Sequence, residues 1–375
     1  MAEHLDVNYE YEENDASSSA FGWDFQANAA LFLFLWYIKQ AKSVKVETKY
    51  QDIEIELIDG KIYAQAKALQ NENASNKNEN SKLRDALVSL AKVKLDTNDK
   101  LLYVSNLRAP IDGDKERFNN SIIKIGDTDN EYAVFIENQI KIIIDRINTI
   151  NKKKNTSKAQ KEKNNILIDK LKKIDVSELL ISSIYPFFGE KEQIRYKKIY
   201  EETLNTLINV LNIDGGQAIA LHKKVCTHWQ NALVFNETIK DSDSKKIEKK
   251  DFLWTIIAME MDTISDDIVY DSVDFSVDSY IDNTVKNYLS DPTYVYHERF
   301  EFSHIVLKDY IDYCNSNHTR RADEEYLKTK NWEKFKGEFA EISDDHLKEL
   351  IIKKTLFRII RSRNDFKKLS EEVTM

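Results

Sequence analysis

The sequence predicts an α/β core, in which helices flank a small mixed sheet, followed by a mainly α-helical domain. Three observations support this fold class. The chain has only 8 Gly and 3 Pro among 375 residues, while 32% of its residues are charged, a composition that favours helix. One segment alternates like two paired strands around an Asp-Gly turn. Helical periodicity dominates from about residue 130 onward.

The predicted core elements lie in the first third of the chain. Ser17–Ser19 can cap a first helix, whose apolar residues lie nearly all round it and so predict burial on several sides. The two strands alternate polar and apolar residues on either side of Asp59-Gly60. An amphipathic helix and a short apolar strand follow. The expected elements are a helix over 20–42, strands over 51–58 and 61–68, a helix over 81–94 and a strand over 100–106.

The rest of the chain has an almost wholly helical pattern. The exception is LLISSIYPFF over 179–188, which predicts a strand or an extended edge that Pro186 ends. The charged segment 240–251 is the preferred domain boundary. We therefore expect three parts: a mobile acidic tail over 1–19, a core domain with a helical extension over 20–239, and a helical regulatory or partner-binding domain over 240–375.

Composition argues against several classes of protein. The two common glycine-rich phosphate-binding motifs do not occur, so a nucleotide-binding fold of those kinds is not expected. Two cysteines cannot form a disulfide framework. The longest apolar run, Ala29–Ile38, is half the length of a membrane span. A net charge of −9 argues against a protein that simply coats nucleic acid, but permits an enzyme with a local basic groove. We expect a cytoplasmic protein with no membrane association.

The predicted hairpin places polar side chains on one face of the sheet. With a two-residue Asp-Gly loop, Asp52 would lie opposite Lys67, and Glu54 opposite Gln65. Because side chains alternate along a strand, these four would project from one side. The other side would carry an apolar set suited to packing, namely Ile53, Ile55, Leu57, Ile62, Ala64 and Ala66.

This polar set has the composition of a magnesium site. Opposed Cβ atoms lie roughly 4.5–5.5 Å apart, so two carboxylates, an amide oxygen and an ammonium would share a small patch. Mg²⁺ prefers hard oxygen ligands and binds through one or two carboxylates together with substrate phosphate oxygens. A lysine beside the metal can orient or deprotonate the attacking water. Glu47, expected at the helix-to-strand junction, is able to reach the same patch.

The same cross-strand pairs also occur on hairpins whose charged face merely meets solvent. The surroundings favour the functional interpretation. A strongly apolar helix precedes the hairpin, and the strand Leu101–Val104 that follows is of the buried type. Polar groups between buried elements carry a desolvation cost, so they are harder to explain as surface residues.

The order of these motifs resembles a known nuclease family. A helix, a D-x-E motif on one strand, a turn and a Q-x-K motif on the next strand are similar to the PD-(D/E)XK nuclease core, in the variant with Gln in place of the second acid. The resemblance extends to the double-stranded DNA endonuclease domain of bacterial anti-phage effectors, which occurs in CBASS effectors and in the nuclease subunit of Lamassu systems. It covers about residues 20–110 and depends on FGWDFQANAALFLF (Phe21–Phe34), YQDIEIEL (Tyr50–Leu57), YAQAK (Tyr63–Lys67) and LYVSN (Leu102–Asn106).

The resemblance implies a role for each matching residue. Asp52 corresponds to the main metal carboxylate, Gln65 takes the place of the second acid, and Lys67 corresponds to the catalytic lysine. Glu54 is a further candidate ligand, and Glu47 matches the acid that some members place on the first helix. The neutral Gln65 departs from the common pattern. Either Glu54 or Glu47 then supplies the missing charge, or metal binding is weak until DNA contributes phosphate oxygens. The implied cofactor is Mg²⁺ or Mn²⁺.

The resemblance also implies an activity and partners. The expected function is a metal-dependent DNA endonuclease that degrades double-stranded DNA upon activation, as the effector of a bacterial anti-phage defence system. No C-terminal motif matches the nucleotide-sensing domain of CBASS effectors, which favours Lamassu-like control by an SMC-like ATPase and an accessory subunit, with a homo-oligomer as the active form. Two alternatives are a noncatalytic nuclease-fold scaffold subunit and an RNase on the same core.

A lysine-rich stretch over 152–173 is a candidate contact for the DNA backbone. It contains nine lysines against Glu162 and Asp169, and phosphate neutralisation requires such clustering. The alternative is a solvated connection between two helices. The candidate residues are Lys152, Lys153, Lys154, Lys158, Lys161 and Lys163.

Overall fold

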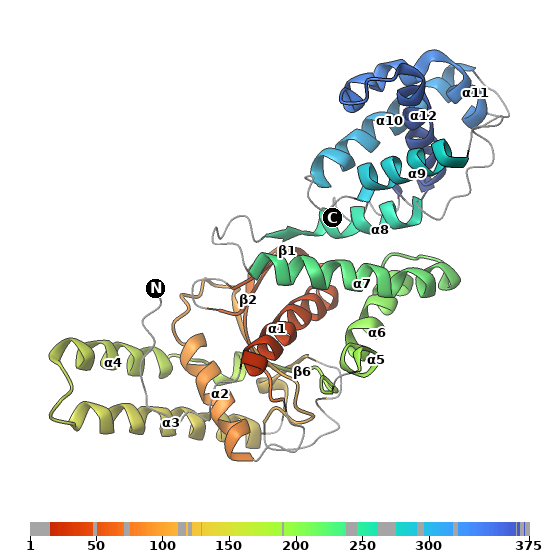
Figure 1. Ribbon diagram of the computed structural model, residues 1–375. Coiled ribbons are helices and arrows are strands. Elements are labelled where there is room, and N and C mark those ends of the chain that lie inside the picture. Colours follow the sequence, from red (N-terminus) through yellow and green to blue (C-terminus); the bar gives the residue numbers. More distant parts are fainter. Residues whose placement is uncertain are drawn as a thin grey trace. The chain divides into compact units, whose positions relative to one another are not determined.

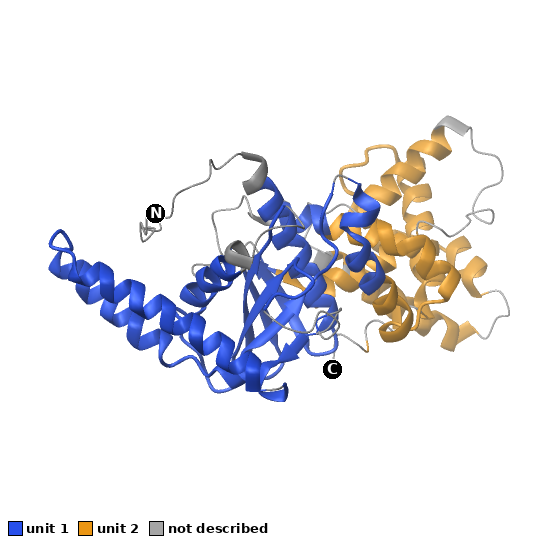
Figure 2. Ribbon diagram, turned by 90° about the horizontal axis from the view of Figure 1, so that it is seen from below, with its two compact units in different colours: residues 1–203, 230–246 blue, residues 204–229, 247–375 orange. Residues whose placement is uncertain are grey.

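A computed structural model gives the fold of the protein (Figure 1). The structure describes residues 16–47, 51–70, 76–111, 118, 122–128, 130–189, 191–237, 246–261, 275–290, 296–317, 322–364, 366–367 and 371. The chain divides into two compact units, coloured separately in Figure 2: unit 1 comprises residues 1–203 and 230–246, and unit 2 comprises residues 204–229 and 247–375. Most of the expected acidic tail and part of the expected boundary segment, residues 240–245, lie outside the described residues.

A mixed seven-stranded sheet has the strand order β5-β6-β4-β3-β2-β1-β7, and six of these strands lie in the N-terminal half of the chain. Strands β1, β2 and β3 form an antiparallel meander, β4 runs parallel to both β3 and β6, and β5 is antiparallel to β6. The strands are β1 (Ala41–Val46), β2 (Ile53–Leu57), β3 (Lys61–Lys67), β4 (Lys100–Ser105), β5 (Ile122–Lys124), β6 (Leu180–Ser183) and β7 (Ile247–Glu248).

Helix α1 (Ala16–Trp36) packs against β1, β2 and β3 on one face of the sheet (Figure 1). Its side chains from residue 27 to 35 are at most 2% exposed, which confirms the predicted burial on several sides. Burying a large apolar side chain contributes about 1.5–3 kcal/mol. The apolar face of the hairpin is also buried as predicted, with Ile53, Ile55, Ile62 and Ala64 fully inaccessible.

The other face of the sheet is covered by α2 (Asn76–Leu90), α3 (Asn130–Lys152) and α4 (Lys158–Leu171). One apolar core joins Leu83 and Leu87 of α2 to Tyr103 of β4, Ile181 of β6 and Ile140 of α3. Because side chains alternate along β3, the residues on the same side as Tyr63, including Gln65 and Lys67, face this second layer.

Helices α3 and α4 form a hairpin that extends from the rest of unit 1 in both views (Figures 1 and 2). We call this hairpin, residues 130–171, the helical arm. The side on which α3 and α4 face each other and the sheet is apolar. Ser157 caps the start of α4, where its side chain accepts a hydrogen bond from the Gln160 N–H. The lysine-rich stretch therefore occupies the connection between the helices and the exposed face of α4.

One element of the core differs from the sequence-based prediction. The first helix was expected over 20–42 with Ser17–Ser19 as its cap, but α1 begins at Ala16, includes these serines and ends at Trp36, and β1 begins at Ala41. The apolar run before residue 38 continues the helical pattern, whereas β1 has no regular alternation of buried and exposed residues and is stabilised by pairing with β2. Pairing of this kind is a tertiary interaction that local periodicity does not report.

The other core predictions agree more closely with the structure. The strand expected over 100–106 is confirmed as β4, and the segment 179–188 contains β6, which pairs with both β4 and β5 and is therefore not at an edge. Helix α2 begins at Asn76, five residues before the expected Ser81.

A mainly helical region follows the sheet, as expected. Its first helices are α5 (Glu192–Arg195) and α6 (Lys197–Asn205), then a π-helical turn over Thr206–Val210 and α7 (Gly215–Glu237). Unit 2 continues with α8 (Lys249–Met261), α9 (Phe275–Ser290), α10 (Tyr296–Asn317), α11 (Ala322–Lys328), a 3₁₀ segment over Lys330–Phe339, and α12 (Asp345–Arg361). Among the described residues, every helix is too short or too polar to cross a membrane.

Candidate active site

The hairpin of β2 and β3 turns one residue earlier than predicted. The Leu57 N–H donates to the Gly60 carbonyl oxygen at 2.8 Å, so Ile58 and Asp59 form the two-residue loop. Gly60 serves a different purpose, because a Cβ at this position would come within 2.7 Å of the Asn98 carbonyl oxygen. The glycine thus permits close backbone packing beside the turn.

The register of the hairpin consequently differs from the predicted one by two residues. Glu54 lies opposite Tyr63, not opposite Gln65 as predicted. The pairing of Ile53 with Ala64, continued by one place, puts Gln65 opposite Asp52, where Lys67 was predicted. A shift of two residues preserves the alternation of side chains, so the predicted polar face is retained.

Asp52 and Lys67 meet at the open end of the hairpin. Lys67 Nζ donates to Asp52 Oδ2 at 3.0 Å, and the Ala66 N–H donates to the same oxygen at 2.9 Å. The Asp52 and Lys67 side chains are 19% and 25% exposed, respectively. They are thus partly desolvated but still reachable from solvent, as an ion pair in a reactive site must be. Within the described part of the chain, Asp52 Oδ1 receives no hydrogen bond.

Gln65 lies on β3, with Asp52 opposite it on one side and strand β4 on the other. It is 2% exposed, and its backbone pairs with Tyr103 of β4. Its position opposite Asp52 brings an amide beside the carboxylate. A buried amide oxygen is a neutral hard donor, so Gln65 can contribute to a cation site without adding negative charge.

Glu47 directly follows β1 and is therefore not part of the first helix or of a helix-to-strand junction, where it was expected. Its N–H donates to the Asp52 carbonyl oxygen at 2.9 Å, which places it beside the first residue of the polar face. Glu47 has a φ of +50°, in the left-handed region that non-glycine residues rarely adopt.

The residue of α1 that reaches this end of the sheet is Gln26, which sequence reasoning missed. Its Nε2 donates to Glu47 Oε1 at 2.9 Å and to the Asp52 carbonyl oxygen at 3.1 Å. The signal in the sequence is an amide inside an apolar helix, which must find a partner when buried.

Glu54 is directed to a different partner. Lys61 Nζ donates to Glu54 Oε1 at 2.8 Å, and the Lys61 and Glu54 side chains are 42% and 17% exposed, respectively. The structure thus brings Asp52, Gln65, Lys67 and Glu47 to one end of the hairpin, whereas Glu54 forms an ion pair nearer the turn.

Lys67 also acts electrostatically on helix α2. Desolvation by the surrounding protein raises the pKa of the Asp85 carboxyl, although this residue retains an exposed surface, and the positive charges of Lys82 and Lys67 oppose the rise. Asp85 is therefore close enough to respond to the charge of Lys67. Helix α2 packs against β3, which explains the proximity.

A second missed residue fixes the chain just after Lys67. Asn106, fully buried at the end of β4, donates to the carbonyl oxygens of Leu69 (2.8 Å) and Phe187 (3.1 Å) and accepts from the Leu69 N–H (3.0 Å). These bonds tie the end of β3 to the end of β4 and to the segment after β6. Lys67 therefore projects from a well-supported strand end.

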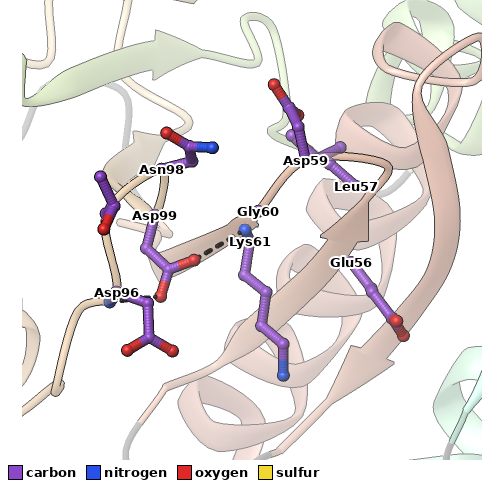
Figure 3. A pocket seen from close by; sticks show the side chains of 9 residues that line it. Glu56, Leu57, Asp59, Gly60, Lys61, Asp96, Asn98 and Asp99 are labelled. Atoms are coloured by element: carbon purple, nitrogen blue, oxygen red, sulfur yellow. Dashed lines mark hydrogen bonds between the residues drawn. The ribbon is translucent and has the colours of Figure 1, made fainter.

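A surface pocket of about 420 Å³ lies at the opposite end of the hairpin (Figure 3). Asp59 and Gly60 line it at the turn, and Asp96 and Asp99 line it on the opposite side. The Oδ1 atom of Asp99 accepts a hydrogen bond from the Lys61 N–H at 2.9 Å. The pocket does not include Asp52 or Lys67. It belongs to the packing of the turn and not to the candidate site.

The candidate DNA-contacting lysines lie on the helical arm. Lys152 ends α3, Lys158 begins α4, and all six of the predicted residues are exposed. They lie in unit 1, the same unit as the Asp52–Lys67 pair.

The donor set at the Asp52 end is sparse for a divalent cation. Among the described residues, no group of three His, Cys, Asp or Glu side chains is arranged to hold a metal ion. Asp52, Glu47 and Gln65 nevertheless provide two carboxylates and an amide. Mg²⁺ commonly binds proteins through only one or two carboxylates and completes its shell with water and phosphate oxygens. The residues present fit such an ion.

A scan against protein-family models and searches of curated proteins and of solved structures found no match to this chain.

Proposed function

We propose that this chain is a metal-dependent endonuclease that cleaves double-stranded DNA. The observation that carries the proposal is the Asp52–Lys67 pair, with 3.0 Å between Oδ2 and Nζ, at a partly exposed end of two paired strands. A carboxylate and an amide that can hold a cation, beside an ammonium that can neutralise charge on a phosphate, are groups that metal-assisted phosphodiester hydrolysis can use. The arrangement of helix, hairpin, helix and strand around this site also supports the resemblance to PD-(D/E)XK nucleases.

In this proposal each residue has a defined role. Asp52, Glu47 and Gln65 hold Mg²⁺ or Mn²⁺, and Glu47 is preferred over Glu54 as the second carboxylate because Glu54 is paired with Lys61. The cation, when bound, supplies Lewis-acid stabilisation of the phosphate and lowers the pKa of a water. Lys67 orients that water and offsets the negative charge that develops on the phosphate.

Substrate binding is assigned to the helical arm. Its exposed lysines, Lys152 to Lys163, provide clustered positive charge for contacts to phosphates in a chain whose net charge is −9. The arm extends from the unit that carries the site (Figure 2), so a duplex can contact both. Contacts to phosphates do not depend on base sequence, which is consistent with nonspecific degradation.

The wider role follows from the resemblance. We propose a bacterial, cytoplasmic effector of anti-phage defence, controlled in a Lamassu-like manner by an SMC-like ATPase and an accessory subunit, and active as a homo-oligomer. The separate helical unit 2 supports this role, because it provides surface for partners and carries none of the proposed catalytic residues.

A nuclease assay with matched lysine variants tests the proposed activity. Purified full-length chain is incubated with double-stranded DNA and Mg²⁺ or Mn²⁺, with and without the partner subunits encoded beside it. Lys67→Ala should abolish cleavage, whereas Lys61→Ala, which removes an ion pair on the same hairpin face, should retain it. Equal background in wild type and Lys67→Ala under every condition would contradict the proposal.

One observation favours the alternative of a noncatalytic scaffold subunit. The second acid of the family pattern is replaced by neutral Gln65, and Asp52 is already bonded to Lys67 and to the Ala66 N–H. On this alternative the DNA affinity of the chain would persist while every variant, including wild type, fails to cut. Parallel DNA and RNA substrates in the same assay distinguish an RNase from a DNase.

A further inference from the structure

Gln26 is a buried polar residue in an apolar part of α1. It is 5% exposed, and its neighbours Phe25 and Ala27 are fully buried. Burial of an amide costs free energy unless hydrogen bonds replace those to water. Gln26 meets this cost by donating from Nε2 to both Glu47 Oε1 and the Asp52 carbonyl oxygen. One amide group therefore joins α1 to both sides of the connection between β1 and β2.

The backbone of Glu47 provides a second observation. A residue with a side chain in the left-handed region costs about 1–3 kcal/mol, and such strain is concentrated at functional sites. Glu47 holds this conformation at a φ of +50°, supported by its N–H bond to the Asp52 carbonyl oxygen and by the bond that its carboxylate accepts from Gln26. Glycine or asparagine would fit this backbone at lower cost, so the strained position of Glu47 points to a function for its side chain.

We propose that Gln26 is a positioning residue of the metal site, which fixes the Glu47 carboxylate beside Asp52 so that both acids face one cation. This role rests on the proposed nuclease function. The bond to Oε1 sets the rotation of the Glu47 carboxylate, and the bond to the Asp52 carbonyl oxygen holds the start of β2 in the same frame. Residues that orient metal ligands in this way tune affinity without touching the ion.

The chemistry of an amide suits this role. An amide N–H orients a carboxylate but leaves its negative charge in place. A lysine or arginine at position 26 would neutralise Glu47 and compete with the cation, whereas a carboxylate would repel it. Because Gln65 is neutral, the proposed site has one negative charge fewer than the common pattern. Binding of a cation therefore depends more strongly on the full negative charge of Glu47.

Binding of Mn²⁺ to the full-length chain, measured by calorimetry without DNA, tests this role. Gln26→Met removes both hydrogen bonds at nearly constant volume, and we expect it to weaken Mn²⁺ binding about tenfold or more. Asn28→Leu is the matched control. Asn28 is 1% exposed on the same helix, donates to the Asp24 carbonyl oxygen and to Asp24 Oδ1, and accepts from Gln230. This variant should lower the melting temperature but leave Mn²⁺ affinity unchanged.

A double variant separates positioning from general loss of stability. On a Glu47→Gln background, adding Gln26→Met should weaken Mn²⁺ binding much less than it does in the wild type, because most of its effect acts through Glu47 and only the bond to the Asp52 carbonyl oxygen is then lost. If Gln26→Met does not fold, Gln26→Asn keeps the amide but shortens its reach and should weaken binding in the same direction. Unchanged affinity in folded Gln26 variants, or equal weakening by Asn28→Leu, overturns the role alone. A wild type that binds no Mn²⁺ overturns the proposed function and the role together.

Discussion

Asp52 uses one carboxylate oxygen, Oδ2, for two donors from β3, the Ala66 N–H and Lys67 Nζ. The backbone donor is fixed by the sheet, so the carboxylate has a set orientation before any ligand binds. Lys67 is a mobile donor by comparison. A cation at Asp52 would compete with the ammonium for the same negative charge, and this competition leaves Lys67 available to a water or a phosphate oxygen.

The sequence did not decide whether Glu47 or Glu54 supplies the second metal carboxylate. Single substitutions of these two residues give the clearest test at the residue scale. Glu47→Gln should lower the cleavage rate at limiting Mg²⁺ about tenfold or more, since a charged ligand is lost. Glu54→Gln should change it little, because it removes a partly exposed ion pair with Lys61, and such pairs contribute about 0–1 kcal/mol. Rates are compared across a Mg²⁺ titration. A larger effect from Glu54→Gln would reassign the second carboxylate.

At the scale of elements, the turn between β2 and β3 depends on Gly60. Gly60→Ala should destabilise unit 1 by about 1–3 kcal/mol, because the new Cβ would lie 2.7 Å from a backbone oxygen and overpacking of this kind costs that amount. Urea denaturation measures the change in the free energy of unfolding.

The control for the turn is Gly22→Ala in α1. A Cβ at Gly22 meets no atom within 4 Å among the described residues, and alanine is favoured over glycine in a helix by about 1 kcal/mol. This variant should therefore be neutral or stabilising. Equal destabilisation by both substitutions would mean that the close approach to Asn98 is not the reason for Gly60.

Much of this core could be predicted from sequence because the relevant information is local. Alternation of Ile53, Ile55, Ile62 and Ala64 predicted the buried face, and it is insensitive to a register shift of two. The exact pairing was not predictable from the Asp-Gly pair, because the position of Gly60 is explained by its distant neighbour Asn98.

The parts of the candidate site that were missed depend on tertiary structure. Strand β1 has no regular alternation of buried and exposed residues, its register is irregular between Ala41 and Ser43, and it forms by pairing with β2. Because β1 was missed, Glu47 was expected at the junction between the first helix and a strand. The hydrogen bond from Gln26 to Glu47 could then not be predicted. Asn106 likewise has partners up to 81 positions away in sequence. Asp52, Gln65 and Lys67 could be predicted as one group because all three lie on one hairpin.

For the whole molecule, charge distribution is the important property. The chain has a net charge of −9, yet the helical arm presents exposed lysines. We expect a Lys152→Gln, Lys153→Gln, Lys154→Gln and Lys158→Gln variant to bind duplex DNA more weakly and with a smaller dependence on salt. Each lost phosphate contact should reduce the slope of log affinity against log salt concentration by about 0.9.

Fluorescence anisotropy in EDTA measures this slope without cleavage. A Lys39→Gln and Lys42→Gln variant is the control, because both lysines are exposed in unit 1 outside the arm. The same loss per substituted lysine in this control would indicate a response to total charge, and an unchanged slope in the arm variant would remove the arm from the DNA-binding surface.

The proposed metal site is tested most directly by locating a divalent cation on the protein. Crystals of the full-length chain grown with Mn²⁺ give anomalous difference density for the ion. We predict a peak at the open end of the hairpin, coordinated by Asp52 with Glu47 and Gln65 in its shell and Lys67 beside it. A peak between Glu54 and Lys61, a peak in the pocket of Asp96 and Asp99, or no peak at saturating Mn²⁺ would contradict the proposed site.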